Sequence, residues 1–199
     1  MIPIIGIIGG IGSGKSFVAD AMTNFGGHLI AADAFGHEAL QQPDIQTKLL
    51  ERWGKTILDT QGNPDRKKIG RIVFSDAKEL RALEALVFPY IEKRILEEIA
   101  AARKDSDIKF IVLDAAIMVE TGWDRHCQKI VFVDAPRELR LARLQEKRGW
   151  NAEEVERREK VQMPLEEKKS RADVVIKNDG EREKVCRQVK DALEQWQVI

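Results

Sequence analysis

Short apolar runs alternate with longer amphipathic stretches along most of the chain. Five runs rich in Ile, Leu, Val and Ala have the length of buried parallel strands. They are Ile4–Ile8, Leu29–Ala32, Phe110–Leu113, Ile130–Val133 and Val174–Ile176. The segments predicted as helices beside them are Phe17–Phe25, Leu80–Lys104, Arg137–Lys147 and Glu181–Gln197. Because strands alternate with helices, the pattern predicts an α/β fold in which a five-stranded parallel sheet carries helices on both faces.

A glycine-rich segment joins the first predicted strand to the first predicted helix. Residues Gly9–Ser16 match the spacing G-x-x-x-x-G-K-S at this strand-to-helix turn. The glycines let the backbone curl until successive N–H groups face one anion, and the helix that begins near Gly14 adds the positive end of its dipole. Lys15 supplies a charge for the β and γ phosphates, and the Ser16 hydroxyl can ligate the Mg2+ that bridges them. The sequence therefore predicts a nucleoside triphosphate site.

Two regions depart from the strand–helix alternation. The stretch between Asp33 and Phe110 is helical in character apart from a turn at Asp59–Pro64, which indicates a helical substrate lobe inserted beside the sheet. Residues 148–171 mix Arg and Lys with Glu, and Pro164 divides them into two helices. Such a run by itself is typical of a solvated helix face, but beside a phosphate loop it can also form a closing lid.

We expect a single domain over residues 1–199 with three parts. The core covers about 1–33, 105–147 and 172–199, the helical lobe about 34–104, and the lid about 148–171.

Composition narrows the classes of partner. The chain has 33 Lys+Arg against 33 Asp+Glu, so no net charge draws the whole protein to nucleic acid or to a membrane surface. Cys127 and Cys186 lie far apart, with no paired Cys or His motif, which disfavours a disulfide framework and a zinc site. The N-terminal apolar run lacks a preceding basic region, and no run reaches the ~20 residues of a bilayer span. We expect a soluble cytoplasmic protein that is a monomer or a small homo-oligomer.

Three aspartates follow predicted strands, at the edge where open α/β sheets bind their ligands. Asp114 is a candidate for holding Mg2+, as an Asp after an apolar strand does in other phosphate-loop enzymes. Asp33 could take a proton from an acceptor hydroxyl, or orient its oxygen. The alternative for each is a cap of the following helix or turn, and the cap is the favoured interpretation for Asp134, which precedes Pro136.

Cations follow the fourth predicted strand. Fixed guanidinium groups stabilise the charge that phosphoryl transfer spreads over the transferred oxygens. Arg143 and either Lys147 or Arg148 lie on one side of the predicted helix, one turn apart, and Arg140 is a weaker member of this group.

Five groups of residues together resemble the dephospho-coenzyme A kinase family. They are Gly9–Ser16, Ile30–Asp33, Gly62–Arg66 with Ile72–Phe74, Asp114–Glu120, and Gln162–Lys169 with Ala172–Gly180. The match is collinear over nearly the whole chain. The resemblance implies a P-loop nucleoside-kinase-like fold with three parts: a nucleotide core, a helical coenzyme-binding lobe and a lid. It also implies transfer of the γ-phosphoryl group of ATP to the ribose 3′-hydroxyl of dephospho-coenzyme A, the last step of coenzyme A synthesis.

The resemblance also assigns roles to individual positions. It places the acceptor hydroxyl at Asp33, the ATP phosphates at the loop, and the adenine near Asn178 and Gly180. The residues expected to bind the nucleotide are Gly10, Gly12, Ser13, Gly14, Lys15, Ser16, Phe17, Arg143, Lys147, Arg148, Asn178 and Gly180. We expect catalysis from Asp33, Lys15 and Arg143, and metal binding from Ser16 and Asp114.

This chain departs from the family pattern at five positions. The family usually has a first Asp within the segment Ala31–Asp33, it favours Pro at Ala116, and it usually has Thr at Phe17, His at Phe88 and Arg at Lys147. The last difference leaves open whether Lys147 or Arg148 serves the nucleotide.

Two other functions share parts of the pattern. A nucleoside monophosphate kinase would have the same loop, sheet and lid, but its acceptor is an anionic phosphate, which Asp33 would repel. A GTP-dependent switch protein would use a D-x-x-G segment, which Asp59–Gly62 matches, but the chain has no Asn-Lys-x-Asp guanine reader. Release of ADP in the presence of each acceptor discriminates between these functions.

Overall fold

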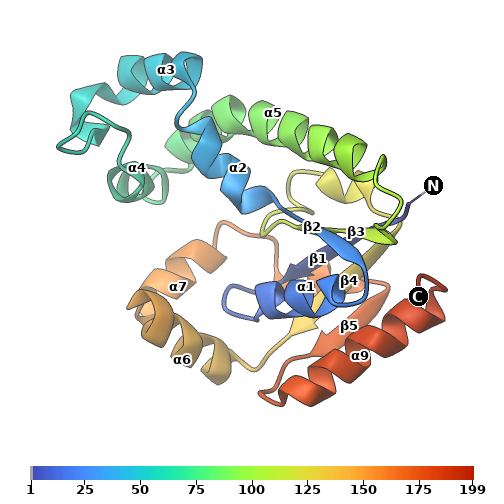
Figure 1. Ribbon diagram of the computed structural model, residues 1–199. Coiled ribbons are helices and arrows are strands. Elements are labelled where there is room, and N and C mark those ends of the chain that lie inside the picture. Colours follow the sequence, from blue (N-terminus) through green and yellow to red (C-terminus); the bar gives the residue numbers. More distant parts are fainter. Residues whose placement is uncertain (1) are drawn as a thin grey trace. The chain divides into compact units, whose positions relative to one another are not determined.

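The computed structural model describes residues 2–199. The central sheet has five parallel strands: β1 Ile4–Gly9, β2 Gly27–Ala31, β3 Phe110–Asp114, β4 Lys129–Asp134 and β5 Val174–Lys177. Their order across the sheet is β2-β3-β1-β4-β5, so β1 is central (Figure 1). The predicted parallel sheet is confirmed, and every strand end lies within two residues of its predicted position.

Helices fill most of the remaining chain. They are α1 Lys15–Thr23, α2 Ala32–Ala39, α3 Pro43–Trp53, α4 Arg66–Val73, α5 Ala77–Ala102, α6 Arg137–Arg148, α7 Ala152–Glu159, α8 Leu165–Ser170 and α9 Arg182–Gln195, with 3-10 helices η1 Gly54–Ile57 and η2 Trp123–His126. The four predicted helices are present as α1, α5, α6 and α9. Pro164 is the N-cap of α8 and separates it from α7, as predicted. None of the described helices combines the length and the apolar composition needed to cross a bilayer.

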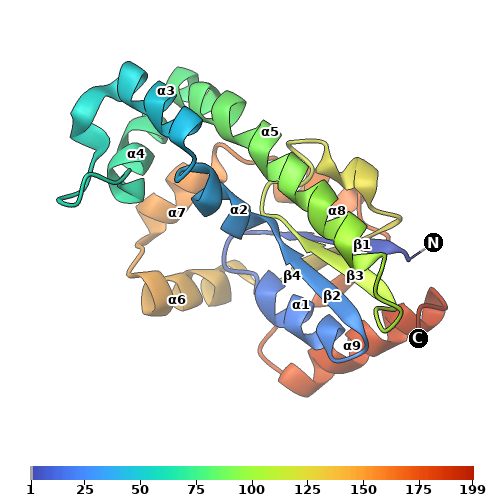
Figure 2. The ribbon, with the colours of Figure 1, turned by 45° about the horizontal axis from the view of Figure 1, so that its top comes forward.

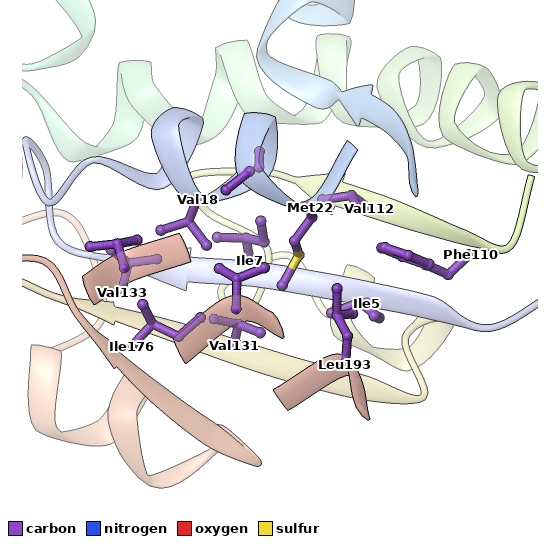
Figure 3. Packing of buried hydrophobic residues seen from close by; sticks show 14 residues of the cluster. Ile5, Ile7, Val18, Met22, Phe110, Val112, Val131, Val133, Ile176 and Leu193 are labelled. Carbon is purple, nitrogen blue, oxygen red and sulfur yellow. The ribbon is translucent and has the colours of Figure 1, made fainter. Parts of the chain in front are cut away.

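The sheet is covered on both faces. Ile7 of β1 packs in one buried cluster with Val18 of α1 and Leu193 of α9 (Figure 3). Neighbouring positions of a strand point to opposite faces, and a Cβ built on Gly6 would lie 2.7 Å from the Met118 sulfur. The segment after β3 therefore closes the other face of β1, and α8 is also a neighbour of β1 (Figure 2). The three layers of the predicted fold class are present.

The chain forms two compact units. The first comprises the chain up to Ala31 together with Glu97–Ile199, and it holds the whole sheet. The second, Ala32–Leu96, contains α2, α3, η1, α4 and most of α5. Inside the second unit, the indole nitrogen of Trp53 donates a hydrogen bond of 2.7 Å to the Glu79 carboxylate and thereby ties α3 to α5.

Candidate active site

The phosphate loop connects β1 to α1 with a backbone that requires glycine. Gly12 and Gly14 have φ values of 79° and 92°, in the left-handed region that residues with a Cβ rarely adopt. Space is also lacking, because a Cβ on Gly12 would lie 2.8 Å from the Arg140 carbonyl oxygen and one on Gly14 would overlap the Asn178 side-chain amide. The left-handed Gly14 is the N-cap of α1, so the helix begins at Lys15, next to the glycine near which the sequence predicted its start.

Side chains from outside the loop hold two of its carbonyl groups. Arg140 Nη1 donates to the Ile11 oxygen at 3.2 Å. The Ser13 oxygen accepts from Arg143 Nη1 at 3.2 Å and from Asn178 Nδ2 at 2.7 Å. In a trans peptide the C=O and the following N–H point in opposite directions. The N–H groups of the residues after Ile11 and Ser13 are thereby directed away from these side chains, which is the arrangement that an anion-binding nest needs.

Arg143 and Asn178 also bind each other. Arg143 Nη2 donates to the Asn178 backbone oxygen at 3.3 Å and to its Oδ1 at 3.2 Å, and Asn178 is 5% exposed. Asn178 follows β5 and donates its backbone N–H to the Asp134 carbonyl at 2.7 Å. The end of β5 is thus linked to the loop, and the Asn178 side chain lies against the Ser13 carbonyl. Gly180 follows two residues later in an exposed position with φ 120°.

The remaining predicted cations differ in their surroundings. Lys15 begins α1, and its Nζ lies 3.4 Å from the Gly9 carbonyl oxygen, to which it donates. Lys147 and Arg148 are exposed in the last turn of α6. The Arg148 guanidinium lies 4.9 Å from the centre of the Trp150 ring, and Arg158 of α7 lies 4.1 Å from the same ring. Arg148 and Arg158 of α7 therefore both contact the ring of Trp150.

The predicted carboxylates lie in different units. Asp114 is the last residue of β3, where it is paired in register with Ile7 of β1 on one side and Ala31 of β2 on the other. Ser16, in the first turn of α1, is exposed. Asp33 is an exposed residue in the first turn of α2, in the second unit. Within residues 2–199, no three His, Cys, Asp or Glu side chains form a metal-binding group.

The prediction that Asp134 caps the following helix is wrong. The N-cap of α6 is Pro136, and no side chain caps this helix. Asp134 is the last residue of β4, two positions before that cap, and its Oδ2 accepts from Lys169 Nζ of α8 at 3.4 Å. The carboxylate therefore contacts α8.

Arg140 has a larger role than the sequence indicated. It is 5% exposed and donates from Nη1 to Glu159 Oε1 of α7 at 2.5 Å. Glu159 also accepts from Arg137 Nη1 at 2.7 Å. Burial by itself would raise the pKa of Glu159, but the hydrogen bonds and charges of the two arginines lower it overall.

Lys168 is a buried residue that the sequence analysis did not single out. Its side chain is 1% exposed, and its Nζ contacts Glu120 Oε1 at 2.7 Å, Gln162 Oε1 at 3.2 Å and the Ala116 oxygen at 3.2 Å. Glu120 Oε1 also accepts from the Met163 backbone N–H at 3.0 Å. Lys168 lies in residues 162–169, which carry part of the family resemblance, and this was the signal in the sequence that could have identified it. The surrounding charged residues are instead typical of a solvated helix face.

Comparisons with known proteins agree with this geometry. The family model described as dephospho-CoA kinase matches residues 3–184. A dephospho-CoA kinase of Geobacillus kaustophilus is 37% identical over 196 residues, which cover 98% of this chain and 97% of that protein. The crystal structure of TT1252 from Thermus thermophilus has a TM-score of 0.81 at 34% identity and covers 98% of this chain and 97% of its own. A dephospho-CoA kinase structure from Campylobacter jejuni has a TM-score of 0.70 at 25% identity, covering 98% of both chains. This chain belongs to the dephospho-CoA kinase family.

Proposed function

We propose that this protein transfers the γ-phosphoryl group of ATP to the ribose 3′-hydroxyl of dephospho-coenzyme A, which gives coenzyme A and ADP in the last step of coenzyme A biosynthesis. The observation that carries the proposal is the phosphate loop, whose Ser13 carbonyl is held by Arg143 and Asn178, in a chain of this family. We expect the reaction to take place in the cytoplasm, with ATP and dephospho-coenzyme A as the small-molecule substrates.

The loop binds ATP through groups that are already oriented. The N–H groups of the loop and of the first turn of α1 face the β and γ phosphates, and the Lys15 ammonium adds a mobile charge. Arg143 donates to the Ser13 carbonyl of the loop, and we propose that its guanidinium also stabilises charge on the transferred oxygens. The further nucleotide contacts that we propose come from Gly10 to Phe17 and from Lys147 or Arg148, with Asn178 and Gly180 near the adenine.

Ser16 and Asp114 fit a magnesium site. Hydroxyl and carboxylate oxygens are the donors that Mg2+ prefers, and the ion usually keeps several substrate or water ligands. Asp114 ends the strand beside β1, the strand that leads into the loop. Ser16 and Asp114 would hold the ion, which would supply positive charge to neutralise the phosphates of ATP.

Asp33 is the proposed general base. Its carboxylate would accept the proton of the 3′-hydroxyl, or orient that oxygen for in-line attack, as the reaction proceeds. In this proposal the helical unit Ala32–Leu96 binds the coenzyme, and residues 148–171 act as a lid that excludes water from the transferring group.

The decisive experiment compares acceptors. Turnover by the wild type and by Asp33→Asn is measured as ADP release with dephospho-coenzyme A, AMP and GMP. Loss of a general base typically costs roughly 10²- to 10⁴-fold in rate, so the variant should be that much slower on dephospho-coenzyme A, with its ATP affinity little changed.

The rival activity gives the opposite result. With a nucleoside monophosphate as the true acceptor, Asp33→Asn removes a repulsive charge and turnover is unchanged or faster. A wild-type preference for AMP or GMP, or a variant as fast as the wild type on dephospho-coenzyme A, rejects the proposed function.

A further inference from the structure

Glu159 fastens α7 to α6. It is the last residue of α7, and its two carboxylate oxygens accept from Arg140 at 2.5 Å and from Arg137 at 2.7 Å. Both arginines belong to the first half of α6 and lie three residues apart, on neighbouring positions of the helix surface. Hydrogen bonds in which both partners are ionised are among the strongest in proteins, and the Glu159 side chain is only 21% exposed.

The same nitrogen of Arg140 also supports the phosphate loop. Arg140 Nη1 donates to the Ile11 carbonyl at 3.2 Å, so one guanidinium nitrogen serves both α7 and the loop. The packing is close, because a Cβ on Gly10 would lie 3.0 Å from this nitrogen. The Arg140 Nε is buried and has no hydrogen-bond partner among the described residues. Two bonds of Nη1, to Glu159 and to Ile11, hold this guanidinium.

We propose that Arg140 is a positioning residue for the phosphate loop. Glu159, by holding Arg140, couples the position of α7 to the conformation of the loop. When Glu159 withdraws, Arg140 is left as a buried cation without its carboxylate, a state that proteins avoid by moving the charge or recruiting another acceptor. Its bond to the Ile11 carbonyl then weakens, and the Gly12 N–H loses its fixed orientation. The inference rests on the proposed function in that the loop is taken to hold the phosphates of ATP.

Glu159→Gln tests the link with the smallest change. The amide has the size of the carboxylate and keeps an acceptor oxygen, but it removes the charge that holds Arg140. Glu156→Gln is the matched control, because Glu156 lies on the same helix and forms an exposed ion pair with Lys160, in which the two side chains are 56% and 72% exposed.

The expected result is a change in binding and not in the chemical step. The loop holds the phosphates in the ground state and in the transition state alike, and removal of such uniform binding raises KM while kcat stays nearly constant. We expect Glu159→Gln to raise the ATP KM on the order of ten-fold, the size typical of one lost charge-assisted hydrogen bond, with kcat within about three-fold of wild type. In protein without nucleotide, the amides of residues 10–14 should exchange faster with solvent. Glu156→Gln should change neither quantity.

Arg137→Met distinguishes the effect of loosening α7 on α6 from the effect of losing the support that Arg140 gives to the phosphate loop. This variant removes the other ion pair of Glu159 and leaves the Glu159–Arg140–Ile11 chain in place, so its effect on loop exchange should be much smaller. Equal effects of Arg137→Met and Glu159→Gln, or unchanged loop exchange and ATP KM in Glu159→Gln, would overturn the inference. A wild type that binds ATP by calorimetry but does not phosphorylate dephospho-coenzyme A contradicts the proposed function instead, and leaves the exchange experiment valid.

Discussion

Substitution of the buried Lys168 by Met should destabilise the protein more than the same substitution of a neighbouring lysine. Met has a similar length but no charge, so Lys168→Met removes the cation that Glu120 Oε1 contacts at 2.7 Å. It also leaves the Ala116 carbonyl and the Gln162 side chain without this donor. These groups join α8 to the segment that follows β3, and that segment begins beside Asp114.

The magnitude follows from the burial of the two partners. Removal of one member of a buried ion pair typically costs about 3–5 kcal/mol. The Lys168 side chain is 1% exposed, but that of Glu120 is 20% exposed, so water can reach part of the orphaned carboxylate and we expect about 2–3 kcal/mol. At roughly 2–4 °C per kcal/mol for a chain of this size, the melting temperature should fall by roughly 4–12 °C.

Urea unfolding followed by circular dichroism measures this cost, and Lys169→Met is the control. Lys169 is the next residue on α8, and it pairs with Asp134 at 3.4 Å with both side chains 39% exposed. Such a pair contributes about 0–1 kcal/mol. The double variant Glu120→Gln with Lys168→Met should lose less than the sum of the single changes, because no unpaired charge remains. A Lys168→Met protein within about 0.5 kcal/mol of wild type, or no less stable than Lys169→Met, would refute the reasoning.

Four further outcomes are expected. Lys15→Ala should slow phosphoryl transfer on the order of 10²-fold or more, because its charge stabilises the β and γ phosphates; steady-state ADP release measures this. Asn178→Ala should raise the ATP KM several-fold, on the order of one hydrogen bond of about 1 kcal/mol, because the Ser13 carbonyl loses its 2.7 Å donor. ATP and dephospho-coenzyme A together should protect residues 148–171 from amide exchange more than either alone, as lid closure requires. Burial raises the pKa of the Cys127 thiol to about 12. In folded protein at pH 8 this thiol should therefore resist alkylation, whereas in urea-unfolded protein it should react. Mass spectrometry of the treated protein measures the difference.

The Cys127 shift also has a consequence for stability. A thiol whose pKa is higher in the folded state than in the unfolded state stabilises the fold fully below the unfolded value, near 9. As pH rises from there toward about 12 the unfolded chain ionises first, and this contribution is lost. Cys127→Ala should therefore flatten the decline of unfolding free energy above pH 9, whereas an equal decline in both proteins would contradict the assigned burial effect.

The strands and the phosphate loop could be predicted because their signals are local. A strand buried on both faces needs a continuous apolar run, and Phe110–Leu113 or Ile130–Val133 shows that pattern in a few residues. The loop depends on left-handed backbone at Gly12 and Gly14, which glycine alone supplies cheaply. The break at Pro164 follows in the same way from the chemistry of a single residue.

The contacts that hold the loop could not be derived from such signals. Arg140, Arg143 and Asn178 reach it from segments about 130 to 165 positions away in the chain, and a helical periodicity does not state which arginine becomes buried. The sequence pattern indicated Arg140 as a weaker candidate for phosphate binding than Arg143, yet Arg140 is the buried one, at 5% exposure. Lys168 lies in a run of charges in which only tertiary packing distinguishes a buried side chain from a solvated one.

The sequence by itself thus determined the five strands, the four helices beside them, the phosphate loop and the family, because each rests on backbone conformations or short motifs that are local in the chain. Only the tertiary structure decided that Asp134 contacts Lys169 in place of capping α6, and that Glu159 and Lys168 join α7 and α8 to the core. The physical reason is that the contribution of a charged side chain to stability depends on its desolvation and on its partner. Both are set by segments remote in sequence.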